Sequence, residues 1–91
     1  MSLAIIHHKV RDFAVWKSAF DDHESAQTAA GMTNARVFQS ADDPTEVTIL
    51  FDVADIATAK EFASSEDLKT AMEGAGVVRT PSFHYLEGPA S

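Results

Sequence analysis

The chain has 91 residues, a formal net charge of -7 at pH 7 and no cysteine. This length fits one domain over residues 1–91, because a single hydrophobic core normally serves about 100–200 residues. Its acidic surface would repel nucleic-acid phosphates and anionic lipid, so neither is an expected partner. Without cysteine, thiol catalysis, disulfides and cysteine-ligated zinc are excluded. No apolar run could cross a membrane and no signal peptide is recognised, so we expect a soluble cytoplasmic protein.

The first predicted element is a strand over residues 3–10, with branched apolar residues on both of its alternating faces. Asp12 then suits a helix N-cap, because its carboxylate can accept hydrogen bonds from the free N–H groups of the first turn. Residues at three- and four-residue steps predict one amphipathic helix from there to Gly31, a left-handed C-terminal stop. The apolar stripe of this helix consists of Phe13, Trp16, Phe20 and His23.

A hairpin is predicted next, from strands over residues 33–40 and 46–53 joined by turn residues at 42–45. The second strand has one wholly apolar face. Its opposite face carries Thr48, Leu50 and Asp52, a mixed set that fits a semi-polar cavity better than open solvent or a dry core.

The second half of the chain repeats the helix-then-strand order. Asp55 is a predicted N-cap, and a new cap within residues 64–67 predicts that the following helix breaks or kinks there. Residues 77–87 suit a final strand, with Pro81 at a bulge, at an edge or before the paired part.

The order strand, helix, strand, strand, helix, strand favours an α+β ferredoxin-like fold, with an antiparallel sheet and both helices on one face. The other face of the sheet is then bare, although its strands carry apolar residues on both sides. We therefore expect a homodimer through the open sheet face, with a second copy of the chain as the cover.

The chain resembles the dimeric α/β-barrel superfamily, which includes antibiotic-biosynthesis monooxygenases and small uncharacterised bacterial families. This resemblance covers nearly the whole chain and is carried by residues 8–12 leading to Trp16, Lys17 and Phe20, by the loop 41–44, and by residues 64–68. It implies two ferredoxin-like subunits packed sheet to sheet into a barrel, each with a small-molecule cavity between sheet and helices.

Members of the superfamily include cofactor-free oxygenases of aromatic polyketides, haem-degrading enzymes, muconolactone isomerases and chlorite dismutases, so the fold alone selects no reaction. The haem-degrading members carry a functional Trp on the sheet. Here Trp16 falls on the first predicted helix, which argues against haem degradation.

The histidines are the first catalytic candidates. His7 and His8 are neighbours on one strand, so they point to opposite faces and cannot both enter one site. We take His8 as a general acid or base, because imidazole titrates near pH 6.5; a hydrogen-bonded structural histidine is the alternative. His84 lies on the last strand, which neighbours the first, and could approach either of them.

Arg36 is the third catalytic candidate. A strand arginine beside Phe38 could stabilise an enolate or hold a carboxylate with two hydrogen bonds. The alternative is an ion pair with Asp52 or Glu46, across the strands or between subunits.

The candidate pocket residues are Trp16, Phe38, Leu50, Asp52 and Tyr85. Trp16 has the spacing of helix-to-sheet packing, so a core position is its alternative. The hydroxyl of Tyr85 could orient a phenol or carbonyl, but a strand tyrosine is equally ordinary at a dimer interface.

No glycine-rich phosphate loop and no glycine-flanked serine nucleophile is present, so NAD, FAD and ATP are not expected, and we predict neither cofactor nor metal. The sequence favours a cavity for a small, partly aromatic organic molecule, with cofactor-independent oxygenation, isomerisation or cyclisation. A non-catalytic ligand-binding or dimerisation protein is the alternative.

Overall fold

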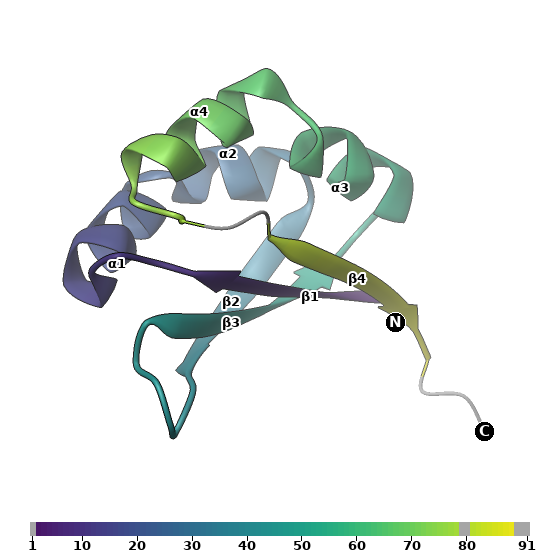
Figure 1. Cartoon of the computed structure of the whole chain (residues 1–91). Helices are drawn as coiled ribbons and strands as arrows, with labels where there is room; N and C mark the ends of the chain where they lie inside the picture. The colour runs from purple at the N-terminus through teal and green to yellow at the C-terminus, as the bar shows by residue number, and fades with distance from the viewer. Residues whose placement is uncertain (1, 79–80, 89–91) are drawn as a thin grey trace.

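A computed structural model describes residues 2–78 and 81–88, which form a four-stranded antiparallel sheet with four helices on one face (Figure 1). The strands are β1 (Ser2–Lys9), β2 (Met32–Gln39), β3 (Glu46–Val53) and β4 (Ser82–Glu87), in the spatial order β2-β3-β1-β4. The helices are α1 (Phe13–Asp22), α2 (Glu24–Ala29), α3 (Ile56–Ala63) and α4 (Glu66–Gly74). The predicted ferredoxin-like fold is confirmed, with each of its two helices divided in two.

Side-chain caps fix three of the helix starts, as the sequence predicts. Asp12, Asp55 and Ser65 each accept a hydrogen bond from the backbone N–H three residues later, at 3.2, 3.3 and 3.2 Å. Ser65 is also the predicted break between α3 and α4. Each such cap satisfies a backbone donor that the first helical turn leaves free.

The first helix differs from its prediction, because it is not continuous to Gly31. It is interrupted at His23, whose backbone N–H donates to the Phe20 carbonyl at 3.1 Å, a tight three-residue turn. The Gln27 side chain also donates to this carbonyl, at 3.4 Å. Two donors that share one carbonyl cannot be predicted from the spacing of apolar residues in the sequence. Gly31 follows α2 with φ 77, the left-handed conformation predicted for it.

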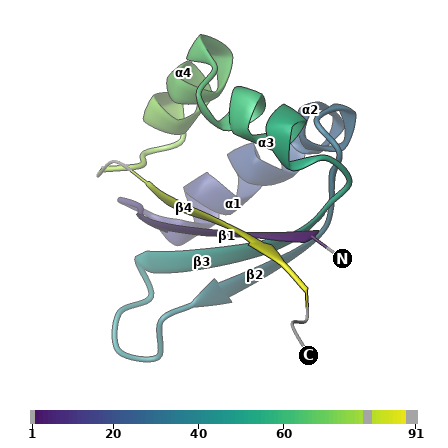
Figure 2. The same ribbon diagram turned by 90° about the vertical axis from the view of Figure 1, so that its right-hand side faces the viewer.

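The sheet has one covered and one open face. Alternate residues of β3 are buried under the helices, which confirms the apolar face predicted for it: Val47, Ile49, Phe51 and Val53. Ala4, Ile6 and His8 of β1 lie on the same covered face. The predominantly apolar core therefore lies between this face and the helices. Figure 2 shows these two layers, with the helices on one side of the sheet.

Among the described residues no helix covers the open face, and several apolar residues there are exposed to solvent. Phe38 of β2 is 52% exposed and Leu86 of β4 is 44% exposed. Leu3, Ile5 and Leu50 lie between them in the sheet and are half-buried.

Two local features refine the strand predictions. Pro81 precedes β4, one of its three predicted positions, while Val77 makes a separate bridge to Val10; residues 79 and 80 of the predicted strand lie outside the described residues. In β2, the register shifts between Thr33 and Arg36, where Asn34 has φ 52. Asparagine tolerates this left-handed conformation better than most residues, which suits it to the bulge.

Candidate active site

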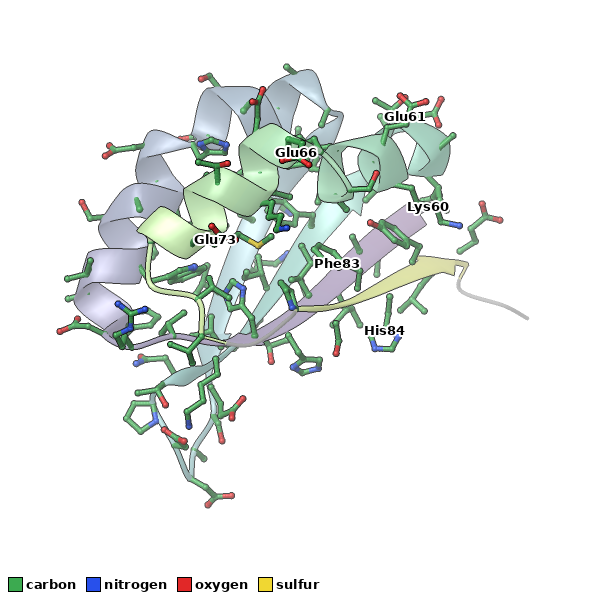
Figure 3. The ribbon with its side chains drawn as sticks, turned by 45° about the horizontal axis from the view of Figure 1, so that its top comes forward. Lys60, Glu61, Glu66, Glu73, Phe83 and His84 are labelled. Carbon is green, nitrogen blue, oxygen red and sulfur yellow. The ribbon has the colours of Figure 1, made fainter. Side chains whose placement is uncertain are left out.

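A cavity of about 300 Å³ lies between the covered face of the sheet and the helices. Its walls are mainly apolar and come from both layers, including Ile49 and Phe51 of β3, Phe20 of α1, Leu68 of α4 and Phe83 of β4. Figure 3 shows Phe83 directed toward the helices and its neighbour His84 directed away from them. This volume is at the lower end of the range typical of small-molecule sites.

His8 is the polar group at the centre of this site. It reaches the cavity from β1 and is only 6% exposed, yet neither Nδ1 nor Nε2 has a hydrogen-bond partner. Its ring makes a T-shaped contact with the Trp16 ring system, with centroids 5.0 Å apart. Burial, and to a smaller extent charge repulsion from the neighbouring His7, lowers the pKa of His8 from 6.5 to about 4. The imidazole is therefore neutral at pH 7.

A neutral imidazole has one N–H donor and one ring nitrogen that accepts. Leaving such a buried group unpaired costs about 1–3 kcal/mol, so unpaired buried groups are rare and call for an explanation. In His8 both the N–H donor and the accepting nitrogen are free to form hydrogen bonds with a bound molecule. A hydroxyl or carbonyl group in the cavity could meet either of them.

Trp16 combines the two roles considered for it. It is buried, stacks on Phe20 with centroids 4.9 Å apart, and contacts Phe13 at 5.8 Å. It also lines the cavity. Trp16 is thus a core residue that forms part of the cavity wall.

Gln27 is a site residue that the sequence reasoning missed. His8 and Gln27 are the buried polar residues of the described chain, and both line the cavity. Gln27 lies seven residues after Phe20 and four after His23, so it continues the stripe of the first helix. A polar residue in register with an apolar stripe was the signal that could have found it.

The predicted pocket mixes residues from the two faces of the sheet. Phe38, Leu50 and Asp52 do not line this cavity, because their strand positions place them on the open face of the sheet. Arg36 and His84 also lie on the open face. Arg36 Nη2 contacts Asp52 Oδ1 at 2.7 Å, the ion pair considered as its alternative.

Tyr85 lies on the covered face but does not line the cavity. Its hydroxyl is buried without a partner, and burial raises its pKa. Lys60 of α3 lies over its ring, with Nζ 5.5 Å from the ring centroid. Of the eight predicted site residues, the structure brings only His8 and Trp16 together at the cavity.

Residues 2–78 and 81–88 contain no group of three or more histidines or carboxylates placed to hold a metal ion. Among these residues, no helix has the length and apolar character needed to span a membrane.

Comparisons with known proteins connect this geometry to a fold. No family model matches the chain, and no curated protein sequence matches it. Several solved structures, in contrast, have a similar fold. A structure assigned as an antibiotic biosynthesis monooxygenase from Bordetella bronchiseptica has a TM-score of 0.79 at 16% identity, covering 98% of this chain and 97% of that one.

Two further structures agree over nearly their whole length. One from Caulobacter crescentus, assigned to the same class, has a TM-score of 0.72 at 18% identity and covers 98% of this chain and 90% of its own. A mutant of SnoaB, a cofactor-independent oxygenase from Streptomyces nogalater, has a TM-score of 0.72 at 10% identity and covers 99% and 94%. Likeness at these identities concerns the fold: the chain has the ferredoxin-like fold of the antibiotic biosynthesis monooxygenases.

Proposed function

We propose that this protein is a cofactor-independent enzyme that acts on a small, partly aromatic organic molecule held in the cavity, by oxygenation or a related proton-transfer reaction. The observation that carries the proposal is His8. It is a buried, neutral imidazole with both nitrogens free, set in the wall of an apolar cavity. The structural likeness to a cofactor-independent oxygenase supports the same reading.

Oxygenation without a cofactor requires the substrate to supply the electrons. An aromatic ketone with an acidic CH₂ group suits this requirement, because loss of a proton leaves an electron-rich enolate. His8 accepts that proton on its free ring nitrogen, and the resulting imidazolium stabilises the enolate beside it. The low pKa of His8 makes it a weak base, but a developing anion next to it raises its affinity for the proton.

The enolate then reacts with O₂. Its electron pair forms the carbon–oxygen bond, and the proton held by His8 moves to the peroxide. Loss of water from this hydroperoxide leaves a new carbonyl, so that CH₂ and O₂ become C=O and H₂O. If His8 instead returns the proton to another carbon, the outcome is isomerisation. Arg36 and His84 face away from the cavity, so this chemistry assigns proton transfer to His8 alone.

The test is O₂ consumption with anthrone, a three-ring ketone that has an acidic CH₂ group. His8→Leu is expected to lower the rate by at least about 100-fold, because general-base contributions are typically of that size or larger. His84→Gln is the matched control, a histidine changed on the opposite face, and should leave the rate unchanged. Binding of anthrone without O₂ consumption would support the non-catalytic alternative, and an equal rate in His8→Leu would refute the role of His8.

The proposal includes a homodimer through the open face of the sheet. Its support is the exposed apolar surface there, with Phe38 at its margin on β2. In analytical ultracentrifugation we expect a dimer at micromolar concentration, and a monomer for Phe38→Asp. Val15→Asp is the control, because Val15 is equally apolar and 60% exposed but lies on α1. A monomeric wild-type protein would refute the dimer.

A further inference from the structure

An acidic side chain lies at the edge of the cavity. Asp22, at the end of α1, is exposed to solvent and also lines the cavity, which places it at the mouth. No described residue forms an ion pair or a side-chain hydrogen bond with its carboxylate. An anion entering the cavity would therefore meet repulsion.

No described lysine or arginine lines the cavity to offset this repulsion, and its other titratable lining residues are His8 and His23. Lys17 borders the adjoining hollow along β2, but its Nζ is held by both carboxylate oxygens of Asp21, at 2.7 and 2.8 Å. Inside the cavity, burial disfavours the charged form of His8. An anion would thus lose its hydration without gaining a cationic partner.

The buried polar groups that line the cavity are neutral, whereas Asp22 and His23 belong to the less buried part of the lining. His8 approaches from the sheet and Gln27 from α2, so they offer an imidazole and a carboxamide within otherwise apolar walls. The hydrogen bond from Gln27 Nε2 to the Phe20 carbonyl is long, at 3.4 Å. A few polar groups within an apolar lining fix the orientation of a ligand and select its functional groups.

From these contacts we infer that the cavity selects uncharged, oxygen-bearing aromatic molecules and rejects carboxylates of the same shape, with Asp22 as the residue that enforces the rejection. This inference rests on the proposed ligand cavity and narrows its substrate class. Hydroxyl, ketone and amide groups can exchange hydrogen bonds with His8 and Gln27 without bringing a charge into the site.

The test compares 2-naphthamide with 2-naphthoate, which share a ring frame and nearly the same shape but differ by one charge. Isothermal titration calorimetry at pH 7 should give at least about tenfold tighter binding of the amide, since a charge without a partner is disfavoured in an apolar site. The indole N–H resonance of Trp16, the sole tryptophan, should shift on binding and so locate the ligand in the cavity.

Two variants distinguish an effect of Asp22 at the cavity mouth from an effect of the net charge of the protein. Asp22→Asn should reduce the difference in affinity between the amide and the carboxylate. Asp42→Asn makes the same change in net charge on an exposed residue outside the cavity, and should leave that difference in affinity unchanged. Equal or tighter binding of the carboxylate would overturn the inference while leaving the ligand cavity intact. An identical response to the two variants would overturn the role of Asp22. A Trp16 resonance that neither ligand moves would overturn both the inference and the ligand cavity.

Discussion

His7 and His8 are neighbours in sequence, but the two faces of the sheet give them opposite surroundings. His7 lies on the open face, where its Nδ1 is 2.7 Å from the hydroxyl of Thr48. His8 lies on the covered face with no partner for either nitrogen and a pKa lowered to about 4. The same side chain is thus a solvated surface group on one face and a neutral, unpaired group on the other. The environment on each face of the sheet, and not the residue type, therefore determines which reactions a histidine side chain can take part in.

The largest expected effect comes from truncating the covered face. Ile49→Ala removes a side chain that is 2% exposed, and should destabilise the protein by about 2–5 kcal/mol, because lost burial and a new cavity add together. Urea unfolding monitored by circular dichroism measures this change.

Leu50→Ala, one residue along on the open face, is the matched comparison. In a monomer its cost should be smaller, since Leu50 is already half-exposed. In the proposed dimer its cost should depend on protein concentration, because folding and association are then linked. Equal, concentration-independent losses for the two variants would contradict the difference between the faces.

The next prediction concerns pH. The unfolded chain protonates His8 near its ordinary pKa of 6.5, whereas the folded protein does so only near 4. Between these values the unfolded state binds more protons, so stability falls as pH falls through this window, by at most about 3 kcal/mol. Above pH 6.5 the full stability is present, and below pH 4 this loss is complete.

Urea unfolding at pH 7 and at pH 4 measures this loss. His8→Leu should lose less stability than the wild type between pH 7 and pH 4. His7→Leu, on the open face, should lose as much stability as the wild type. Carboxylates also titrate in this range, so each variant is compared with the wild type at both pH values. If His8→Leu and the wild type lose the same stability on acidification, burial of a neutral His8 is contradicted.

Much of this architecture could be predicted from the sequence, because it depends on local rules. The caps at Asp12, Asp55 and Ser65 and the alternation in β3 follow from single residues or a two-residue period. The order of elements then leaves few sheet topologies.

The site was harder to predict because it depends on the face to which each side chain points. Within one strand, alternation separates Leu50 from Ile49, but sequence alone does not say which alternate set the helices cover when both contain apolar residues. In β2, the bulge at Asn34 also changes the alternation. At the interruption at His23, the Phe20 carbonyl accepts hydrogen bonds from the His23 N–H and the Gln27 side chain, a detail that the spacing of apolar residues does not encode.

The smallest expected effect tests the open face itself. Arg36 and Asp52 form an ion pair there at 2.7 Å, with Asn34 Nδ2 donating to the second carboxylate oxygen at 3.1 Å. Both charged side chains are about one-third exposed, so in a monomer Arg36→Gln should cost less than about 1 kcal/mol. If a second copy covers this face, the same change leaves the Asp52 carboxylate buried without its partner, and the loss becomes larger. Chemical unfolding at low and high protein concentration separates these cases: a small loss at both concentrations means that the pair remains in solvent, which would contradict a dimer through this face.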